Sequence, residues 1–522
     1  MSTSGVSDVL LQGYTPSIIL GVAAVLLICW QRLSVQCDPR EPPLLKPSIP
    51  YIGHIIGLFR YNGEYFEKLN AKKPLPIATL PMINGKLYII TQPTLIQSAY
   101  RNKNLSFDPF MVDFAQRMLE LSEEVMVPIR DKPEFIPDLV KEIHGSMLGE
   151  HLYKMNADAL NDVAVTINGL SDTFRPDSLY LWIRETLTMA TCNALLGSHN
   201  PLKDDLSLVD ALWDFEAGML PLVLGIMPSF VAPKAYKARA TVQAALQKYY
   251  AKKYDLEPDV AKMTKARAGV YRRYNISSDD IGKLELALLH VSTANAIPTL
   301  FWLVAFIASD PALTASLREE LPCVITISKS KDGKREARVD ITKFDPDCPL
   351  LVSCYREVIR LVNSQLGSRR VMADTTISDG KSTYLLRKGW DVNMPSGVTH
   401  LLPGSWGPNA SSFDARRFMK LDTKGAASEK EKEEKRAYIP FGGGKHLCPG
   451  RNFAFAEILG FAAVLLMGFD VKKDDGKLIE VPKIRRAKLG EAVSKPFGKG
   501  LTMGANITRR EGWEDVSWHF TT

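Results

Sequence analysis

A single cysteine, Cys448, lies between a glycine-rich stretch and a strongly apolar run. Residues 441–451 read FGGGKHLCPGR, and NFAFAEILGFAAVLL follows them. The amides and dipole at a helix start favour an anionic sulfur, so a cysteine placed there is suited to bind a metal as a thiolate. Gly450 would let backbone amides approach that sulfur. Glycines before it could lie close against a flat ligand. A buried structural cysteine is the ordinary alternative, but the surrounding residues argue against it.

This segment resembles the haem-binding signature F-x-x-G-x-[HR]-x-C-x-G of the cytochrome P450 superfamily. It matches at Phe441, Gly444, His446, Cys448 and Gly450. A thiolate as the sole protein ligand of haem iron pushes electron density into a bound O–O bond. The resemblance implies a haem-thiolate enzyme with haem b and with Cys448 as the axial iron ligand. It also implies further cofactor contacts from His446, Arg369, Phe441, Gly442 and Gly450.

Three charged residues complete the family pattern. Glu357 and Arg360 are spaced i,i+3, which places an acid and a base on one helical face. They resemble the E-x-x-R pair of the family. Arg417 resembles the arginine that completes this triad, although Arg416 sits beside it. The resemblance gives the triad a structural role in holding the loop before Cys448.

The haem propionates need cationic or hydrogen-bonding partners where they are partly buried. The resemblance assigns this role to Arg369 and His446, with Arg370 as a neighbouring rival for Arg369. A third contact is expected from an earlier helix, but the usual W-x-x-x-R pattern does not occur between residues 100 and 165. That contact has no assignment from the sequence.

A long central helix is expected within residues 278–321. Where the family usually has an acid and a threonine beneath the oxygen site, this chain has Ile297 and Pro298. Proline removes an N–H, frees the carbonyl of Ala294 and kinks the helix. Asn295 and Thr299 are then the nearest polar candidates for oxygen binding and proton delivery. The alternative that they are ordinary polar residues of a buried helix stays open.

The A-N-x-x-P-T-x-F-W pattern of this helix resembles the branch that holds steroid 7α- and 12α-hydroxylases and prostacyclin synthase. The resemblance favours a monooxygenase that uses O2 and NADPH-derived electrons from a cytochrome P450 reductase, with cytochrome b5 as an optional donor. The expected substrate is hydrophobic and terpenoid or steroid-like, in fungal secondary metabolism. The alternative is a haem-thiolate isomerase or dehydratase that rearranges a peroxide without a reductase.

An anchor precedes this catalytic part. Residues 9–30 carry no charge over 22 positions, about enough for a helix to cross a bilayer. We expect a lumenal segment 1–8, a membrane-spanning signal anchor 9–30, a proline-rich hinge 31–53 and a cytosolic catalytic domain 54–522 in the endoplasmic reticulum membrane. A cleaved signal peptide is the alternative, but no basic residue precedes the run. Membrane lipid is therefore an expected partner.

Composition excludes several other classes. The chain has 522 residues, 46% of them hydrophobic, and a net charge of +7, which is too weak to indicate nucleic-acid binding. Seven dispersed cysteines without a C-x-x-C pair favour reduced thiols over a zinc site or a disulfide framework.

Apolar spacing predicts helices over 95–320, a β-hairpin within 77–93 and short strands within 371–395. The charged run 424–436 is predicted to be a mobile surface loop. The expected fold is the mainly α cytochrome P450 fold with a smaller β portion, preceded by one transmembrane helix.

Overall fold

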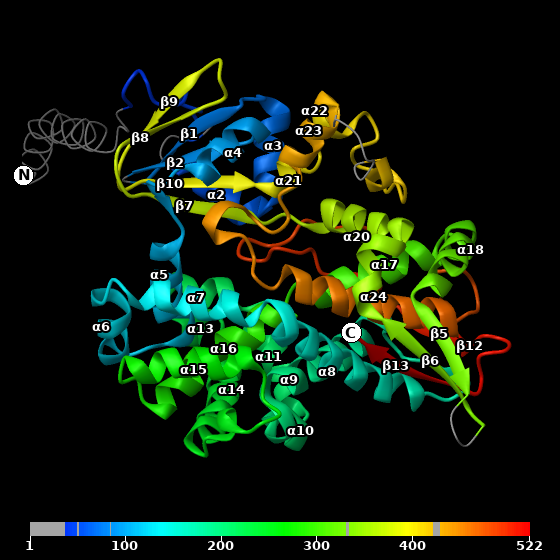
Figure 1. Cartoon of the computed structure of the whole chain (residues 1–522). Helices are drawn as coiled ribbons and strands as arrows, with labels where there is room; N and C mark the ends of the chain where they lie inside the picture. The colour runs from blue at the N-terminus through cyan, green and yellow to red at the C-terminus, as the bar shows by residue number, and fades with distance from the viewer. Residues whose placement is uncertain (1–36, 48, 50–51, 84, 330–332, 421–427) are drawn as a thin grey trace, which may run out of the picture.

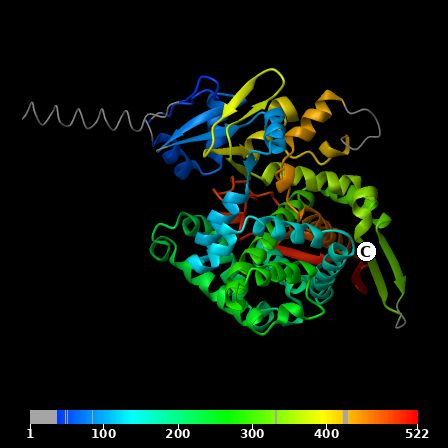
Figure 2. The same ribbon diagram turned by 60° about the vertical axis from the view of Figure 1, so that its left-hand side comes forward.

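The computed structural model describes residues 37–47, 49, 52–83, 85–329, 333–420 and 428–522. Helices make up most of the described elements, and the strands form small sheets. Figures 1 and 2 show a part that contains β1, β2, β7 and β10 beside a larger helical part. The predicted mainly α class with a smaller β portion is confirmed. The predicted anchor at 9–30 and the beginning of the hinge lie outside the described residues.

The largest described sheet has the strand order β1-β2-β10-β7-β3. Its first two strands pair antiparallel and form the hairpin predicted within 77–93, and β10 runs parallel to β2 and antiparallel to β7. Helices α2–α4 lie beside it, and β8 and β9 form a separate hairpin (Figure 1). The bounds are β1 (Ile77–Met82), β2 (Gly85–Ile90), β3 (Leu105–Ser106), β7 (Leu366–Val371), β8 (Thr375–Ser378), β9 (Thr383–Leu386), β10 (Asp391–Pro395), α2 (Gly53–Tyr61), α3 (Glu64–Lys72) and α4 (Pro93–Arg101).

The helical part follows the apolar spacing that the sequence predicts over 95–320. Its helices pack around one large apolar core. Their bounds are α5 (Asp108–Leu119), α6 (Glu123–Asp131), α7 (Phe135–Ser146), α8 (Gly149–Asn168), α9 (Leu179–Leu196), α10 (Pro201–Asp204), α11 (Ser207–Ala217), α12 (Met219–Leu224), α13 (Pro228–Val231), α14 (Pro233–Ala251), α15 (Lys262–Arg273) and α18 (Pro311–Glu320). Helices α19 (Phe344–Asp347), α20 (Pro349–Val362), α21 (Ser396–Thr399) and α22 (Pro403–Trp406) follow.

The central helix is divided, and it is shorter than the predicted range 278–321. Helix α16 (Ser278–Thr293) ends just before Asn295, and α17 (Ala296–Ala308) begins just after it. Pro298 falls in the first turn of α17, where a missing N–H costs no intrahelical hydrogen bond. The helix axis is thus interrupted next to Pro298, as predicted, and α17 ends at Ala308, inside the range in which the helix was expected.

The charged run 424–436 is not simply a loop. Residues 421–427 lie outside the described part, but α23 (Glu429–Ala437) is a helix. Ser428 accepts the amide hydrogen of Glu431, and the Glu431 side chain accepts the amide hydrogen of Ser428. This capping box satisfies two amides at the helix start and explains why a strongly polar segment becomes helical. The prediction of a mobile loop is wrong for residues 429–436.

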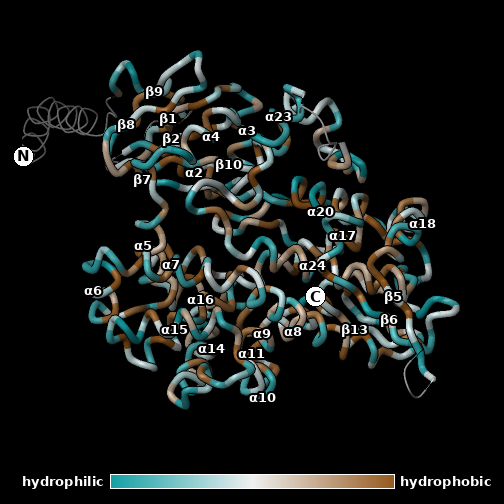
Figure 3. The backbone as a smooth tube through the Cα atoms, viewed as in Figure 1, coloured by the Kyte–Doolittle hydropathy of each residue, from teal (hydrophilic) through white to brown (hydrophobic). Residues whose placement is uncertain are grey.

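Helix α24 (Arg451–Gly468) carries the apolar run that follows Cys448. From Ala456 to its end every residue is buried. In Figure 3 the interior helices, including α17 and α24, contain much of the hydrophobic colour. Within the described ranges, Ser278–Ala308 and Arg451–Gly468 are long and apolar enough to span a membrane, but 72% of each apolar window is buried in the fold. Both are core helices.

Two further sheets of the described part were not predicted. One has the order β13-β6-β5 and the other β11-β12-β4. They join segments far apart in the chain, so local spacing gives little sign of them. Their bounds are β4 (Thr173–Phe174), β5 (Ile325–Lys329), β6 (Arg335–Asp340), β11 (Phe469–Lys473), β12 (Ala505–Arg509) and β13 (Val516–Thr521).

Candidate functional site

Cys448 lies three residues before α24 and close to its first amides, as the sequence predicts. Burial raises the pKa of the Cys448 thiol, while hydrogen bonds from the backbone N–H groups of Gly450 and Arg451 and the charge of Arg451 lower it. The Cys448 amide itself donates to the Phe441 carbonyl at 3.0 Å, which closes the loop. Cys448 is half-buried, and a sulfur that already receives amide hydrogens is suited to bind a metal ion, because coordination deprotonates a thiol outright.

The glycines before Cys448 make room for protein as well as for a ligand. A Cβ on Gly443 would lie 2.4 Å from the Tyr100 ring, and one on Gly444 would lie 2.3 Å from the Tyr100 carbonyl oxygen. Gly442 and Gly444 have φ values of 71° and 64°, which favour glycine. That the glycines also let the loop approach a flat ligand stays a prediction. At Gly443 and Gly444 the close neighbour is Tyr100 of α4.

Arg369, rather than Arg370, faces the cysteine loop. In β7 the side chains alternate between the two faces, so Arg369 is buried and Arg370 is not. Arg369 donates to the Gly443 carbonyl at 3.0 Å, and its guanidinium carbon lies 5.2 Å from the Tyr100 ring centroid. Burial lowers the pKa of Arg369. Arg370 instead pairs with Asp391 at 2.8 Å. The alternation of side chains along β7 thus decides which of the two adjacent arginines faces the cysteine loop, a choice that the sequence alone could not make.

Tyr100 was missed by the sequence prediction. Its hydroxyl is buried and has no hydrogen-bond partner among the described residues. Burial raises the pKa of Tyr100 to about 12, so the hydroxyl is protonated and can donate. A tyrosine within an amphipathic helix has no spacing that marks it as a ligand contact. Only the fold brings it against Gly443 and Arg369.

His446 lies in the cysteine loop and contacts the start of α5. Its Nε2 accepts the amide hydrogen of Phe107 at 3.3 Å and lies 3.7 Å from Asp108. Burial and the charge of Arg369 lower the pKa of His446 to about 4. A neutral His446 that accepts at Nε2 carries its proton on Nδ1. The Nδ1–H is therefore the group through which His446 can donate to a propionate.

The three charged residues predicted to form a structural triad come together. Glu357 and Arg360 are fully buried in α20, with 2.7 Å between Glu357 Oε2 and Arg360 Nε. Arg417 Nε lies 3.0 Å from Glu357 Oε1. Arg416 points elsewhere, toward the sulfur of Met419. The geometry selects Arg417 as the partner.

The triad connects to the cysteine loop through His400. Arg360 donates to the His400 carbonyl at 2.5 Å, and His400 Nε2 accepts the amide hydrogen of Ile439 at 3.0 Å. Asn363, at the end of α20, also donates to the Pro440 carbonyl at 3.2 Å. These contacts hold the residues that lead into Phe441 and Cys448. His400 and Asn363 carry no motif and were not predicted.

Asn295 and Thr299 lie at the break between α16 and α17. Asn295 is exposed, as is Val291 one turn earlier, although most of the neighbouring helical residues are buried. The Thr299 hydroxyl donates to the Asn295 carbonyl at 2.7 Å. The hydroxyl proton of Thr299 is thus used within the helix. Asn295 is the one of the two whose side chain faces open space.

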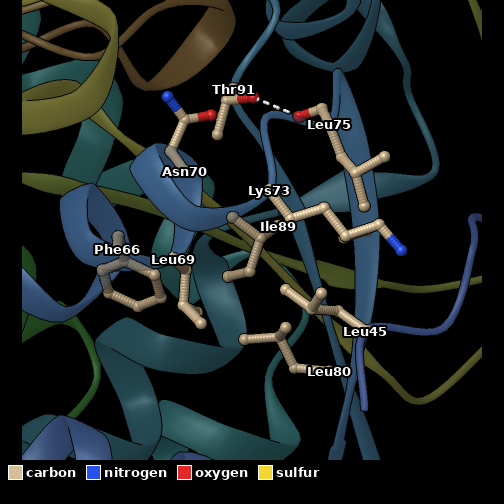
Figure 4. A pocket seen from close by; sticks show the side chains of 10 residues that line it. Leu45, Phe66, Leu69, Asn70, Lys73, Leu75, Leu80, Ile89 and Thr91 are labelled. Atoms are coloured by element: carbon tan, nitrogen blue, oxygen red, sulfur yellow. Dashed lines mark hydrogen bonds between the residues drawn. The ribbon is translucent and has the colours of Figure 1, made fainter. Parts of the chain in front are cut away.

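A pocket between α3 and the β1–β2 hairpin lies apart from these residues. Figure 4 shows its apolar lining, with the Thr91 hydroxyl donating to the Leu75 carbonyl at 2.6 Å. Its volume of about 30 Å³ has room for little more than a water molecule. It is too small to bind an organic substrate.

The residues around Cys448 fit an iron porphyrin. The sulfur has amide donors, Arg369 is buried next to the loop, and the Tyr100 hydroxyl has no partner among the described residues. A buried guanidinium and a buried hydroxyl favour a negatively charged, hydrogen-bond-accepting group such as a propionate. Within the described residues no group of three or more His, Cys, Asp and Glu side chains could hold a bare metal ion.

Comparison with known proteins gives concordant matches. The family model "Cytochrome P450" matches residues 206–491. A cytochrome P450 monooxygenase of Gibberella zeae is 36% identical over 100% of this chain and 98% of its own length. A pig (Sus scrofa) 5-beta-cholestane-3-alpha,7-alpha-diol 12-alpha-hydroxylase is 23% identical over 92% of this chain and 95% of its own length. The structure of retinoic acid bound cyanobacterial CYP120A1 has a TM-score of 0.66 at 17% identity and covers 91% of this chain and 100% of that chain.

Proposed function

The chain belongs to the cytochrome P450 family and is a monooxygenase, and from this premise we propose that it oxidises a hydrophobic, steroid- or terpenoid-like substrate with haem bound through Cys448. The observation that carries the haem assignment is the half-buried Cys448 sulfur, toward which the Gly450 and Arg451 amides donate. When bound, haem supplies the activation of O2.

The residues of this chain position and hold that group. Cys448 would ligate the iron, and the adjacent amides would moderate electron donation from its sulfur. Arg369 would bind a propionate, His446 would donate from Nδ1, and the Tyr100 hydroxyl would serve as the third contact, which the sequence left unassigned. The triad supports the residues that lead into the loop, because Arg360 donates to the His400 carbonyl and the His400 ring accepts the Ile439 amide hydrogen. Glu357, Arg360 and Arg417 therefore act as scaffold.

Asn295 is the better candidate for holding a proton donor near the reacting atoms. Its side chain is exposed at the helix break, whereas the Thr299 hydroxyl donates to the backbone. An amide side chain can hold a water molecule by donating and accepting, but it does not itself ionise. Proton supply in this proposal comes from water held at Asn295.

The substrate class rests on relatedness and on apolar surface. The 12-alpha-hydroxylase that matches most of the chain is named for a steroid substrate. Exposed Val291, on the same helix face as Asn295, offers an apolar contact beside the polar one. An apolar polycyclic substrate would bury this surface.

We also propose that the chain is anchored in the endoplasmic reticulum membrane with its catalytic part in the cytosol. The uncharged run 9–30 supports this, as does an exposed apolar group around α12–α13. Ile226, Met227 and Phe230 are 68%, 66% and 78% exposed, and such a patch is suited to contact lipid. Protease treatment of sealed microsomes should degrade the catalytic part. Its protection would contradict the proposal.

The enzymatic proposal is tested in microsomes that contain the protein with or without NADPH–cytochrome P450 reductase. A panel of steroids and terpenoids is offered, and products are identified by mass. We expect an added oxygen that comes from labelled O2 and that requires both reductase and NADPH. Conversion of a hydroperoxide without reductase, in place of oxygen insertion, would instead support the isomerase.

A further inference from the structure

Two thiols outside the cysteine loop lie close together at the junction between α18 and α20. Cys323 ends the short 3-10 helix Leu321–Cys323, and Cys348 comes directly before α20. Their sulfur atoms are 3.6 Å apart. The hairpin of β5 and β6 lies between the two cysteines in the chain. Cys323 and Cys348 therefore lie next to each other at the two ends of the segment that contains this hairpin.

The two thiols differ in accessibility. Cys323 is exposed, whereas Cys348 is fully buried. The Cys323 thiol donates to the Asp347 carbonyl at 3.3 Å, which keeps it beside Cys348. Burial raises the pKa of the Cys348 thiol. A small oxidant therefore reaches Cys323 first, and Cys348 is held close by as the second thiol.

We propose that Cys323 and Cys348 form a reversible disulfide, at a modification site separate from Cys448. With a peroxide as oxidant, the Cys323 sulfur attacks one peroxide oxygen and the O–O bond breaks. With hydrogen peroxide this leaves a sulfenic acid on Cys323 and releases water. The Cys348 sulfur then attacks the Cys323 sulfur, the S–O bond breaks, and the leaving hydroxide takes the Cys348 proton as a second water. Two thiols are oxidised and one peroxide is reduced.

The site is placed where a covalent bond would affect the scaffold of the cysteine loop. Glu320 accepts the amide hydrogens of Leu350 and Leu351 at 2.7 and 2.9 Å, so the segment before Cys323 already caps α20. Helix α20 carries Glu357 and Arg360. A disulfide would tie the same junction covalently. In a reducing compartment such a bond is expected to be transient and to respond to oxidants.

The full-length, haem-loaded protein is treated with hydrogen peroxide, unfolded in the presence of N-ethylmaleimide and digested with trypsin without reduction. Trypsin places Cys323 in residues 319–329, and it places Cys348 together with Cys354 in residues 344–356. We expect these two peptides to be linked, with one maleimide on Cys354, and to separate on addition of dithiothreitol. Fragmentation of the linked peptide should assign the bond to Cys348.

Matched variants provide the controls. Cys348→Ala should abolish the linked peptide, whereas Cys354→Ala should retain it. If Cys348→Ala does not fold, the fragmentation pattern of the wild type decides between Cys348 and Cys354. The proposal is overturned if peroxide converts wild-type Cys323 to sulfinic or sulfonic acid while Cys348 remains free for maleimide. A bond assigned to Cys354 would overturn it equally.

Discussion

Arg360 donates a hydrogen bond of 2.5 Å to the main-chain oxygen of His400. The His400 ring in turn accepts the amide hydrogen of Ile439, two residues before Phe441. A buried ion pair in α20 is thereby connected to the loop that ends at Cys448. Because of this connection, we expect loss of the Glu357–Arg360 ion pair to disturb the loop as well as α20.

Glu357→Gln should therefore reduce haem loading. The change leaves buried Arg360 without its carboxylate, and breaking such a pair costs about 3–5 kcal/mol. Haem content per polypeptide, measured after expression at low temperature, should fall at least severalfold. Arg416→Gln is the control, because Arg416 is exposed and lies outside the triad. A Glu357→Gln protein with the haem content and thermal midpoint of the wild type would remove the triad from this account.

His400 should make the fold sensitive to acid. Burial, and then the charge of Arg360, lower the pKa of His400 to about 3, whereas an unfolded histidine has a pKa of about 6.5. Between these values the unfolded chain binds a proton that the folded chain does not, so stability falls as the pH decreases from about 6.5 to about 3. At pH 5 the titration of His400 should lower the free energy of unfolding by about 2 kcal/mol relative to its value at neutral pH.

The variant His400→Gln isolates this effect, because glutamine can accept the Ile439 amide but does not titrate. Thermal midpoints at pH 7.5 and pH 5 are compared for both proteins. The wild type should lose more stability than the variant over this interval. Equal losses would show that His400 does not control the acid response.

Arg369 and Arg370 should differ sharply in their effect on haem retention. Arg369→Gln removes the buried guanidinium beside Gly443, whereas Arg370→Gln removes a partly exposed partner of Asp391. Transfer of haem to apomyoglobin should be at least tenfold faster from Arg369→Gln than from the wild type, since a lost charge-assisted contact costs about 1.5–3 kcal/mol. Arg370→Gln should stay near the wild-type rate. The reverse order would reassign the propionate contact.

Gly443 should tolerate no side chain while Tyr100 is present. An added Cβ would lie 2.4 Å from the Tyr100 ring, and forced packing of this kind typically costs about 1–3 kcal/mol. Gly443→Ala should lower the thermal midpoint, and Tyr100→Ala should restore part of the loss in the double variant. Gly404→Ala is the matched control, because a Cβ there has no neighbour within 4 Å. If Gly443→Ala melts like the wild type, the loop does not depend on this contact.

The sequence was sufficient to predict those site residues that lie within a short local motif. Cys448, Glu357 and Arg360 follow local spacing, and Pro298 marked the helix break. The sequence alone could not decide between Arg369 and Arg370, or between Arg416 and Arg417; the three-dimensional structure was needed for both choices. Strand alternation in β7 buries Arg369, and long-range packing turns Arg417 toward Glu357.

Other features had no local signal. Tyr100 became part of the site only because α4 packs against the cysteine loop. The helix α23 was missed because its charge suggested a loop, although Ser428 and Glu431 have the spacing of a capping box. The sheets that contain β6 and β12 depend on strands far apart in the chain, which periodicity within one segment does not reveal.

The central claim is that the Cys448 sulfur is bonded to haem iron, and the absorption spectrum of the reduced protein under carbon monoxide tests it most directly. The account predicts the strongly red-shifted Soret band of a thiolate-ligated haem in the wild type and its loss in Cys448→Ala. A haem-loaded wild type without this band, or a Cys448→Ala protein that keeps it, would contradict the account.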